Sequence, residues 1–269
     1  MEKFKAFCIF LSFLFTFLLF MSILSLFLVP NPSEIISSLK TEEMIYSLKL
    51  SIATSLASTV LVILFSIPVG YALSRHDFIG KSIVKSILDL PMAFPELVLG
   101  LALLLLFGQS FIGKFLESFG IKIVFTKIGI VIAQFFTALP YAVRVIYSTF
   151  EGINPRYEFV SRSLGYGELE TFFRISLPLA KNGLFASTII TFARCMGAFG
   201  AVLILAGGSY MNTEILPITL YLNISYGNLG MAITSGILLI IISFIAILIF
   251  EKFEGVNSSN FKKVESIRN

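Results

Sequence analysis

Few residues of this chain have the types and spacing that chemistry requires. His76 is the sole histidine and has no cysteine cluster near it, so metal ligation is not expected. The run Gly80-Lys81-Ser82 ends like a phosphate-binding loop, but Arg75 stands where that motif needs its first glycine. Serines within the apolar segments have no histidine base. We therefore expect no catalytic residue, no bound metal and no cofactor.

Arg194 is the charged residue that most needs an explanation. It lies near the middle of the apolar stretch 184–206, where an arginine costs about 2.5–3.5 kcal/mol and usually faces a cavity or a partner. It can line a pathway and offer its guanidinium to an anion. It can equally form a structural ion pair with Glu96 or Asp89. The sequence leaves both interpretations open.

Small residues surround Arg194 at helical spacing. Ala193, Gly197 and Ala201 recur every four residues, with Gly200 beside them, and such a stripe lets helix backbones approach closely. Packing is one interpretation. The other is that Gly197 and Gly200 take part in a gate together with Arg194.

The segment 151–182, called here the long loop, is too long and too punctuated for a simple connector. Asn154-Pro155 is a typical helix start, and Gly165 is a typical helix end. Three apolar residues share one face of this short helix, whereas three polar residues lie elsewhere and are expected on its exposed polar side. The apolar residues are Tyr157, Val160 and Leu164, and the polar ones are Glu158, Ser161 and Arg162.

A second helix is expected to follow in the long loop. It should begin near Gly167, because Glu168 and Glu170 then lie in its first turn, where acidic groups suit the helix dipole. Leu177-Pro178 should mark its end.

The amino-acid composition indicates the environment in which these segments lie. The chain is 57% hydrophobic and only 13% charged, far from the average of a soluble domain. The two cysteines, Cys8 and Cys195, both lie in apolar segments, so no disulfide framework is expected. Six stretches are long and apolar enough to span a bilayer. They predict an all-α integral membrane protein with spans at 6–29, 50–73, 87–107, 128–147, 184–206 and 229–250.

Positive charges predict the direction of these spans, because loops rich in lysine and arginine stay in the cytoplasm. Fourteen such residues fall on the side of the two termini and the long loop, and five on the other. Both termini are therefore expected in the cytoplasm. The weak, scattered net charge of +4 does not favour nucleic-acid binding. We divide the chain into 1–49, with the first span and an outer loop, a core at 50–250, and a cytoplasmic tail at 251–269, which we expect to be loosely ordered from Gly255 onward.

The long loop resembles the coupling loop of permease subunits of ATP-binding-cassette (ABC) importers. Gly165, nine residues, Ile175 and then Leu177-Pro178 match the second half of that family's motif. The first half departs, because Phe159, Val160 and Ser161 stand at the Glu-Ala-Ala positions, and the acid, Glu158, comes one residue earlier. The resemblance implies that the helix from Tyr157 to Leu164 is a coupling helix that inserts into the ATPase subunit.

Other segments are similar to the molybdate, tungstate and sulfate branch of this family. They include Leu88-Asp89-Leu90-Pro91 and the run from Phe192 to Gly200. The branch has an acidic residue in that run where this chain has Ala198, so the resemblance does not identify the anion.

The resemblance implies a type I ABC importer permease fold that works as a homodimer in the cell membrane. Its implied partners are two copies of an ABC ATPase, an extracytoplasmic oxyanion-binding protein and the lipid bilayer, and the implied cargo is molybdate or tungstate. Alternatives within the family are permeases for sulfate, thiosulfate, iron or polyamine. An ion-gradient transporter is an alternative of another class, and the sequence shows no sign of the matching broken helices expected of one.

Overall fold

In the part of the chain that it describes, residues 2–28 and 30–268, the computed structural model consists of helices joined by turns and loops. Side chains are described for 4–28 and 30–249. The helices are α1 Glu2–Leu28, α2 Pro32–Leu39, α3 Glu42–Arg75, α4 Lys81–Asp89, the 3₁₀ turn η1 Leu90–Met92, α5 Glu96–Gly108, α6 Phe111–Ser118, α7 Lys127–Glu151, α8 Arg156–Ser163, α9 Glu168–Thr171, the π-helical turn η2 Phe172–Ser176, α10 Leu177–Met196, α11 Gly200–Ala206, α12 Leu216–Ser225 and α13 Leu229–Arg268.

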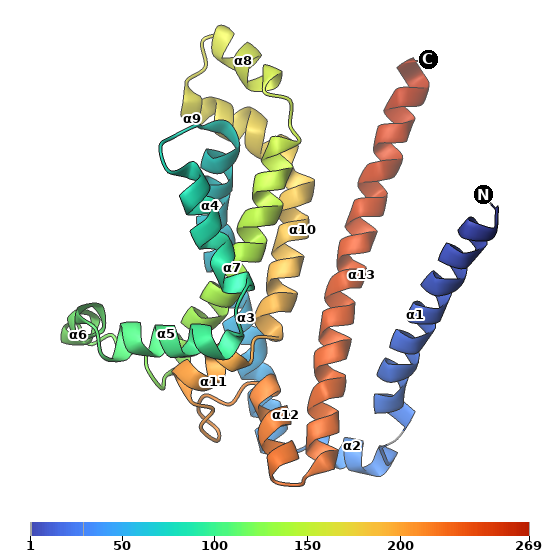
Figure 1. Cartoon of the computed structure of the whole chain (residues 1–269), viewed down its shortest axis with the longest axis vertical. Helices are drawn as coiled ribbons and strands as arrows, with labels where there is room; N and C mark the ends of the chain where they lie inside the picture. Colours follow the sequence, from blue (N-terminus) through green and yellow to red (C-terminus); the bar gives the residue numbers. More distant parts are fainter. Residues whose placement is uncertain (1, 29, 269) are drawn as a thin grey trace.

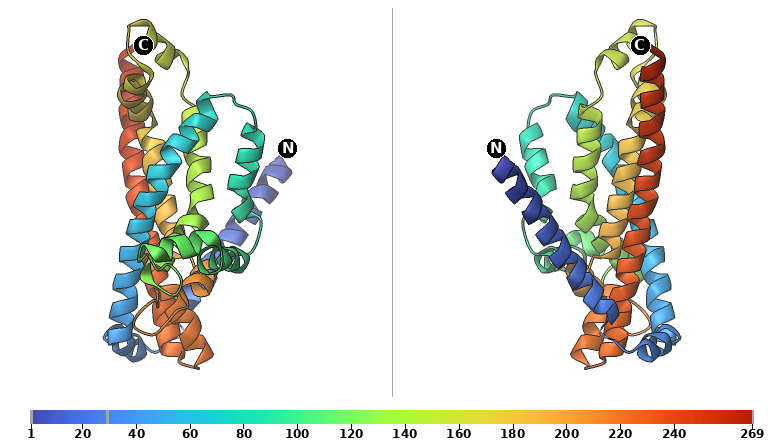
Figure 2. Two further views of the ribbon diagram at one scale, coloured as in Figure 1. Left: turned by 90° about the vertical axis from the view of Figure 1, so that its left-hand side faces the viewer. Right: turned by 90° about the vertical axis from the view of Figure 1, so that its right-hand side faces the viewer.

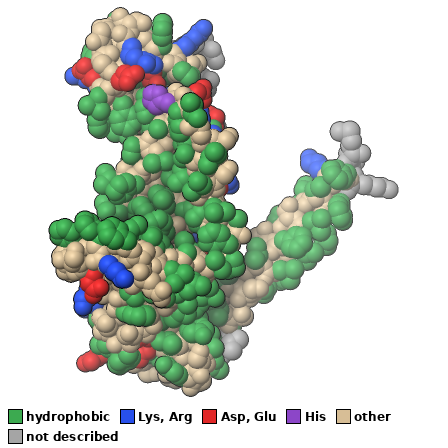
Figure 3. Space-filling model, turned by 60° about the vertical axis from the view of Figure 1, so that its left-hand side comes forward, with side chains coloured by type: hydrophobic (Ala, Val, Ile, Leu, Met, Phe, Trp, Pro, Cys, Tyr) green, Lys and Arg blue, Asp and Glu red, His purple; other side chains and the backbone are tan. Residues whose placement is uncertain are grey.

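Five of these segments are long and apolar enough to cross a membrane, and α4 with α5 forms a sixth if that bent pair counts as one span. Figures 1 and 2 show α3, α7, α10 and α13 running roughly side by side, with α1 leaning away from them. Charged side chains gather near the two ends of the body in Figure 3, and hydrophobic ones cover the middle. This is the distribution that a bilayer requires, since water reaches only the ends.

The third predicted span, 87–107, is not one continuous helix. The chain bends by 112° between the helical stretches Lys81–Met92 and Glu96–Gly108, and α5 runs across the bundle in Figure 1. Pro91 and Pro95 cause this break, because each lacks a backbone donor and the two lie only four residues apart. Gly100 then lets α5 pack closely on α11, since a Cβ there would lie 2.9 Å from the Cα of Ala201.

The fifth predicted span, 184–206, is also broken. α10 ends at Met196, and α11 begins at Gly200. The expected stripe of Ala193, Gly197 and Ala201 on one helix face is therefore wrong. No paired breaks were expected from the sequence, yet the chain breaks in both its third and fifth predicted spans.

A buried polar cluster holds α3, α7 and α10 together. The Gln134 side chain donates to the Ser55 hydroxyl and to the Cys195 carbonyl, at 3.2 and 3.1 Å, and it accepts from Ser58 at 2.8 Å. Small hydroxyl residues let the backbones approach, and hydrogen bonds between helices supply attraction that lipid does not. This cluster keeps the three helices in fixed register.

The two chain ends and the long loop lie at one end of the molecule. Figure 1 shows the start of α1, the end of α13 and helix α8 at the top, and α2 and α12 at the bottom. α13 continues to Arg268, through the tail that was expected to be loosely ordered from Gly255 onward.

Glu214 lies between α11 and α12 at the opposite end from the long loop. Its side chain is buried, and its Oε2 has no hydrogen-bond partner among the described residues. Burial, and then the neighbouring Glu43 carboxylate, raise the pKa of Glu214 from 4.5 to about 6. The folded state therefore holds this proton more tightly than the unfolded state, and this contribution to stability is lost as pH rises through about 6.

Raising pH from about 4.5 to about 7 is expected to lower the melting temperature of the purified protein less in Glu214→Gln than in the wild type, because glutamine cannot ionise. The exposed Glu42 provides the matched control, and Glu42→Gln should follow the wild type. Parallel melting curves for the wild type and Glu214→Gln over this range would contradict the prediction.

Candidate functional site

The long loop contains the first short helix where it was predicted, and a second helix begins where it was expected. α8 begins at Arg156, one residue after Pro155, and the Asn154 side chain accepts from the backbone N–H of Arg156 at 3.0 Å. α8 ends at Ser163, and Gly165 follows with φ +95°. Only glycine adopts this left-handed conformation without strain. Gly167 then precedes α9, whose first turn carries Glu168 and Glu170.

α8 presents an apolar face to the outside of the chain. Tyr157, Phe159, Val160 and Leu164 are between 55% and 74% exposed. Large side chains left exposed at the end of a membrane protein, beyond its apolar band, mark a surface that another molecule covers. The predicted apolar stripe is therefore present, and it points away from the protein's own core.

Glu158 and Ser161 do not lie on an exposed polar side, so that expectation is wrong. Both are buried, at 3% and 5% exposure. Arg75 Nε lies 2.9 Å from Glu158 Oε1, and the Ser176 hydroxyl donates to the same oxygen at 2.7 Å. The Ser161 and Thr171 hydroxyls are 3.0 Å apart.

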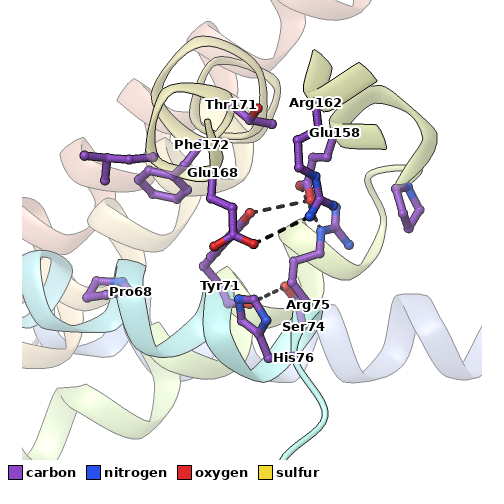
Figure 4. A pocket seen from close by; sticks show the side chains of 12 residues that line it. Pro68, Tyr71, Ser74, Arg75, His76, Glu158, Arg162, Glu168, Thr171 and Phe172 are labelled. Carbon is purple, nitrogen blue, oxygen red and sulfur yellow. Dashed lines mark hydrogen bonds and ion pairs between the residues drawn. The ribbon is translucent and has the colours of Figure 1, made fainter. Parts of the chain in front are cut away.

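The Arg75–Glu158 pair joins the long loop to the end of α3. Arg75 also donates from Nη2 to the Ile153 carbonyl at 2.8 Å. The side chains of Arg75 and Glu158 are only 8% and 4% exposed, and a charged pair so well buried needs all of its partners. Figure 4 shows the pair at one side of a cavity of about 640 Å³, with Tyr71, His76 and Phe172 also lining it.

The second helix does not end at Leu177-Pro178. It passes through the π-helical turn η2 into α10, so residues from Glu168 to Met196 form one helical segment of 29 residues. A π turn changes the hydrogen-bond register, so the missing N–H of Pro178 does not break the helix. Ile175 and Leu177 are half-buried and Pro178 is exposed.

Arg194 pairs with Glu96. Arg194 Nη2 lies 2.7 Å from Glu96 Oε1, and Oε2 accepts from the backbone N–H groups of Phe199 and Gly200 at 3.3 and 3.2 Å. The Tyr141 ring lies 4.8 Å from the guanidinium carbon. Glu96 therefore joins the start of α5 to the break between α10 and α11.

Asp89 is not the partner of Arg194. Its Oδ2 lies 2.9 Å from Arg144 Nη2 instead. Gly200 lies close to the backbone of α5, since a Cβ there would be 3.0 Å from Leu97 N, whereas a Cβ at Gly197 would meet nothing closer than 3.6 Å. Close packing thus needs Gly200 and does not need Gly197.

Sequence reasoning missed Arg75, Ser176 and Tyr141. Arg75 and Glu158 are 83 residues apart, and no local pattern connects them. Among the described residues, no three His, Cys, Asp or Glu come together as a metal site.

These features define a helical membrane protein with two broken spans and a structured loop with an exposed apolar face. Residues 63–255 match the family described as "Binding-protein-dependent transport system inner membrane component". The chain belongs to this family, the permease subunits of ABC importers, and is a transport subunit rather than an enzyme.

Two relatives differ in the substrate that their names give. The chain is 36% identical over 260 residues to the molybdate/tungstate transport system permease protein WtpB of Methanocaldococcus jannaschii, covering 95% of this chain and 100% of the relative. It is 31% identical to the sulfate transport system permease protein CysT of Salmonella typhimurium, covering 68% of this chain and 66% of the relative.

A solved structure shares the fold. A chain of a bacterial alginate ABC transporter, in complex with an alginate-bound periplasmic protein, superposes with a TM-score of 0.75 at 15% identity, over 93% of both chains. This similarity concerns the fold alone.

Proposed function

We propose that this chain translocates a tetrahedral oxyanion, molybdate or tungstate, as the permease of an ATP-driven importer in the cytoplasmic membrane. The observation that carries the proposal is the 36% identity to a molybdate/tungstate permease over 95% of this chain. The sulfate permease matches a smaller part of the chain, which makes sulfate the second candidate.

The exposed face of α8 is the proposed contact with the ATPase. Its residues Tyr157, Phe159, Val160 and Leu164 supply apolar area. Ser161, through Thr171, and the turn at Gly165 hold the helix at its place in the loop. Ile175, Leu177 and Pro178 belong to the same proposed coupling loop. Glu158 acts from the buried side of α8, because its ion pair with Arg75 fixes α8 to the end of α3. Two permease copies, each with one ATPase copy, and an extracytoplasmic oxyanion-binding protein complete the proposed assembly.

The proposed orientation places the long loop and both termini in the cytoplasm. Fourteen lysine and arginine residues against five favour it, and the two chain ends lie at the same end of the molecule as α8 (Figure 1).

Cysteine labelling is expected to reveal this orientation. Ile79→Cys lies in the turn beside Lys81 and Ser209→Cys in the loop after α11, and both positions are exposed. In a Cys8→Ser background, which removes the exposed native thiol, a membrane-impermeant maleimide should label only Ser209→Cys in intact cells. Ile79→Cys should react after the cells are opened. Equal labelling in intact cells would contradict the proposed topology.

Substrate-dependent transport tests the function itself. Proteoliposomes containing the permease, its ATPase and the binding protein should take up labelled molybdate when ATP is enclosed with the ATPase, and unlabelled tungstate should compete more strongly than sulfate. Stronger competition by sulfate would favour the second candidate. Uptake driven by an ion gradient without ATP would instead support a transporter of another class.

A further inference from the structure

The Arg194–Glu96 pair is accessible, unlike the other short arginine–glutamate pair that joins distant helices. The side chains of Arg194 and Glu96 are 36% and 25% exposed, against 8% and 4% for Arg75 and Glu158. A sealed pair needs further hydrogen bonds to offset the cost of burying its charges, and it is closed to other ions. Partial exposure means that another anion can reach the guanidinium.

Arg194 also has binding capacity that Glu96 does not use. Its Nε is buried and has no hydrogen-bond partner in the described part of the chain. The guanidinium contacts one oxygen of Glu96 through Nη2 and lies over the Tyr141 ring. A guanidinium has five N–H donors in a planar fork, which suits two oxygens of one anion. The pair in this structure therefore leaves donors for a second oxygen.

The Glu96 carboxylate is itself bound as an oxyanion. One oxygen contacts Arg194, and the other accepts from the N–H groups of Phe199 and Gly200. Molybdate, tungstate and sulfate present two oxygens at the edge of a tetrahedron, and they carry the same sign of charge with greater magnitude. Of the groups that bind Glu96, Arg194 is the charged one, and it can bind a passing oxyanion in place of Glu96.

We propose that Arg194 contacts the translocated oxyanion and that Glu96 is a tethered competitor, which occupies Arg194 when no substrate is present. This inference rests on the proposed function. Displacement of Glu96 releases the link between the start of α5 and the break after α10, so substrate binding and helix movement are coupled. By linkage, whatever separates these helices also exposes Arg194 to substrate.

Competition predicts the effect of removing the charge of Glu96. A site that is open in only about one tenth of the molecules binds its ligand about tenfold more weakly than its intrinsic affinity. Glu96→Gln keeps an oxygen that can accept from the two backbone N–H groups but removes the negative charge. The concentration of molybdate that half-saturates this variant should fall about tenfold, whereas Arg194→Gln should show no saturable binding.

The experiment measures binding of labelled molybdate to the purified permease–ATPase complex in detergent, without the binding protein. Glu117→Gln is the matched control, because Glu117 forms an exposed pair with Lys122, and it should bind like the wild type. Size-exclusion chromatography confirms that each variant is assembled. If Glu96→Gln does not assemble, Glu96→Asp provides the test, because its shorter side chain reaches Arg194 less well and should also lower the half-saturating concentration.

Unchanged, weaker or absent molybdate binding in the assembled Glu96 variant would overturn this inference. So would wild-type binding in Arg194→Gln. The proposed function would still stand if the wild type imports molybdate. Failure of the wild type to import any tetrahedral oxyanion would overturn the function itself, and that result needs no variant.

Discussion

Gly165→Pro is expected to abolish ATP-driven uptake while the membrane helices still insert. Gly165 has φ +95°, whereas proline fixes φ near −65°. The change also removes the N–H that donates to the Arg162 carbonyl at 3.0 Å. The conflict costs about 3 kcal/mol or more, enough to redirect the chain after α8. Uptake by proteoliposomes and co-purification of the ATPase measure the effect.

Two alanine variants serve as controls for the Gly165 prediction. Gly165→Ala keeps the N–H but meets the left-handed backbone, at a cost of about 1–2 kcal/mol, so partial loss of uptake is expected. Gly167→Ala should be close to wild type, since Gly167 has φ −66° and nothing lies within 4 Å of the added Cβ. Normal ATP-driven uptake by Gly165→Pro would contradict a coupling role for this loop.

Glu158→Lys is expected to unfold the long loop locally and so prevent ATPase association. The substitution removes the partner of the buried Arg75 and places a second positive charge beside it. Breaking a buried pair by removing one partner costs about 3–5 kcal/mol. Limited proteolysis of the purified permease should then cut within 151–182 faster than in the wild type, before any ATPase is added.

Glu168→Lys is the matched control for Glu158→Lys. Glu168 lies 3.6 Å from Arg162, with side-chain exposures of 79% and 50%, and such a surface pair contributes about 0–1 kcal/mol. Its proteolysis should therefore match the wild type. Exchanging the charges in Arg75→Glu/Glu158→Arg should recover part of the resistance. Wild-type resistance in Glu158→Lys would show that the pair does not hold the loop.

Local signals in the sequence predicted the turns of the long loop well. Asn154-Pro155, Gly165 and Gly167 act through backbone geometry and nearest neighbours, so their effect does not depend on distant residues. The face of α8 was misjudged for a physical reason. Its apolar side faces outward, so the polar side, including Glu158, is the one that packs on the rest of this chain.

Proline did not predict where helices break. Pro68 and Pro140 lie inside the continuous helices α3 and α7, whereas Pro91 and Pro95 separate α4 from α5. Neighbouring helices decide whether the freed backbone groups find new partners. The choice of Glu96 over Asp89 as the partner of Arg194 also depends on the bend between α4 and α5, which no local pattern contains.

The π turn before Pro178 joins the long loop to α10 without a break, in one helical segment from Glu168 to Met196. Movement of the loop can therefore tilt α10. The part of this segment after the π turn, α10, has 20 residues and is about 30 Å long at 1.5 Å per residue. A tilt of about 5° at the η2 end of α10 would move its other end by about 3 Å if α10 stays straight. Arg194 lies near that far end, 2.7 Å from Glu96. A small rotation of the long loop can therefore separate this distant contact without any helix having to unfold.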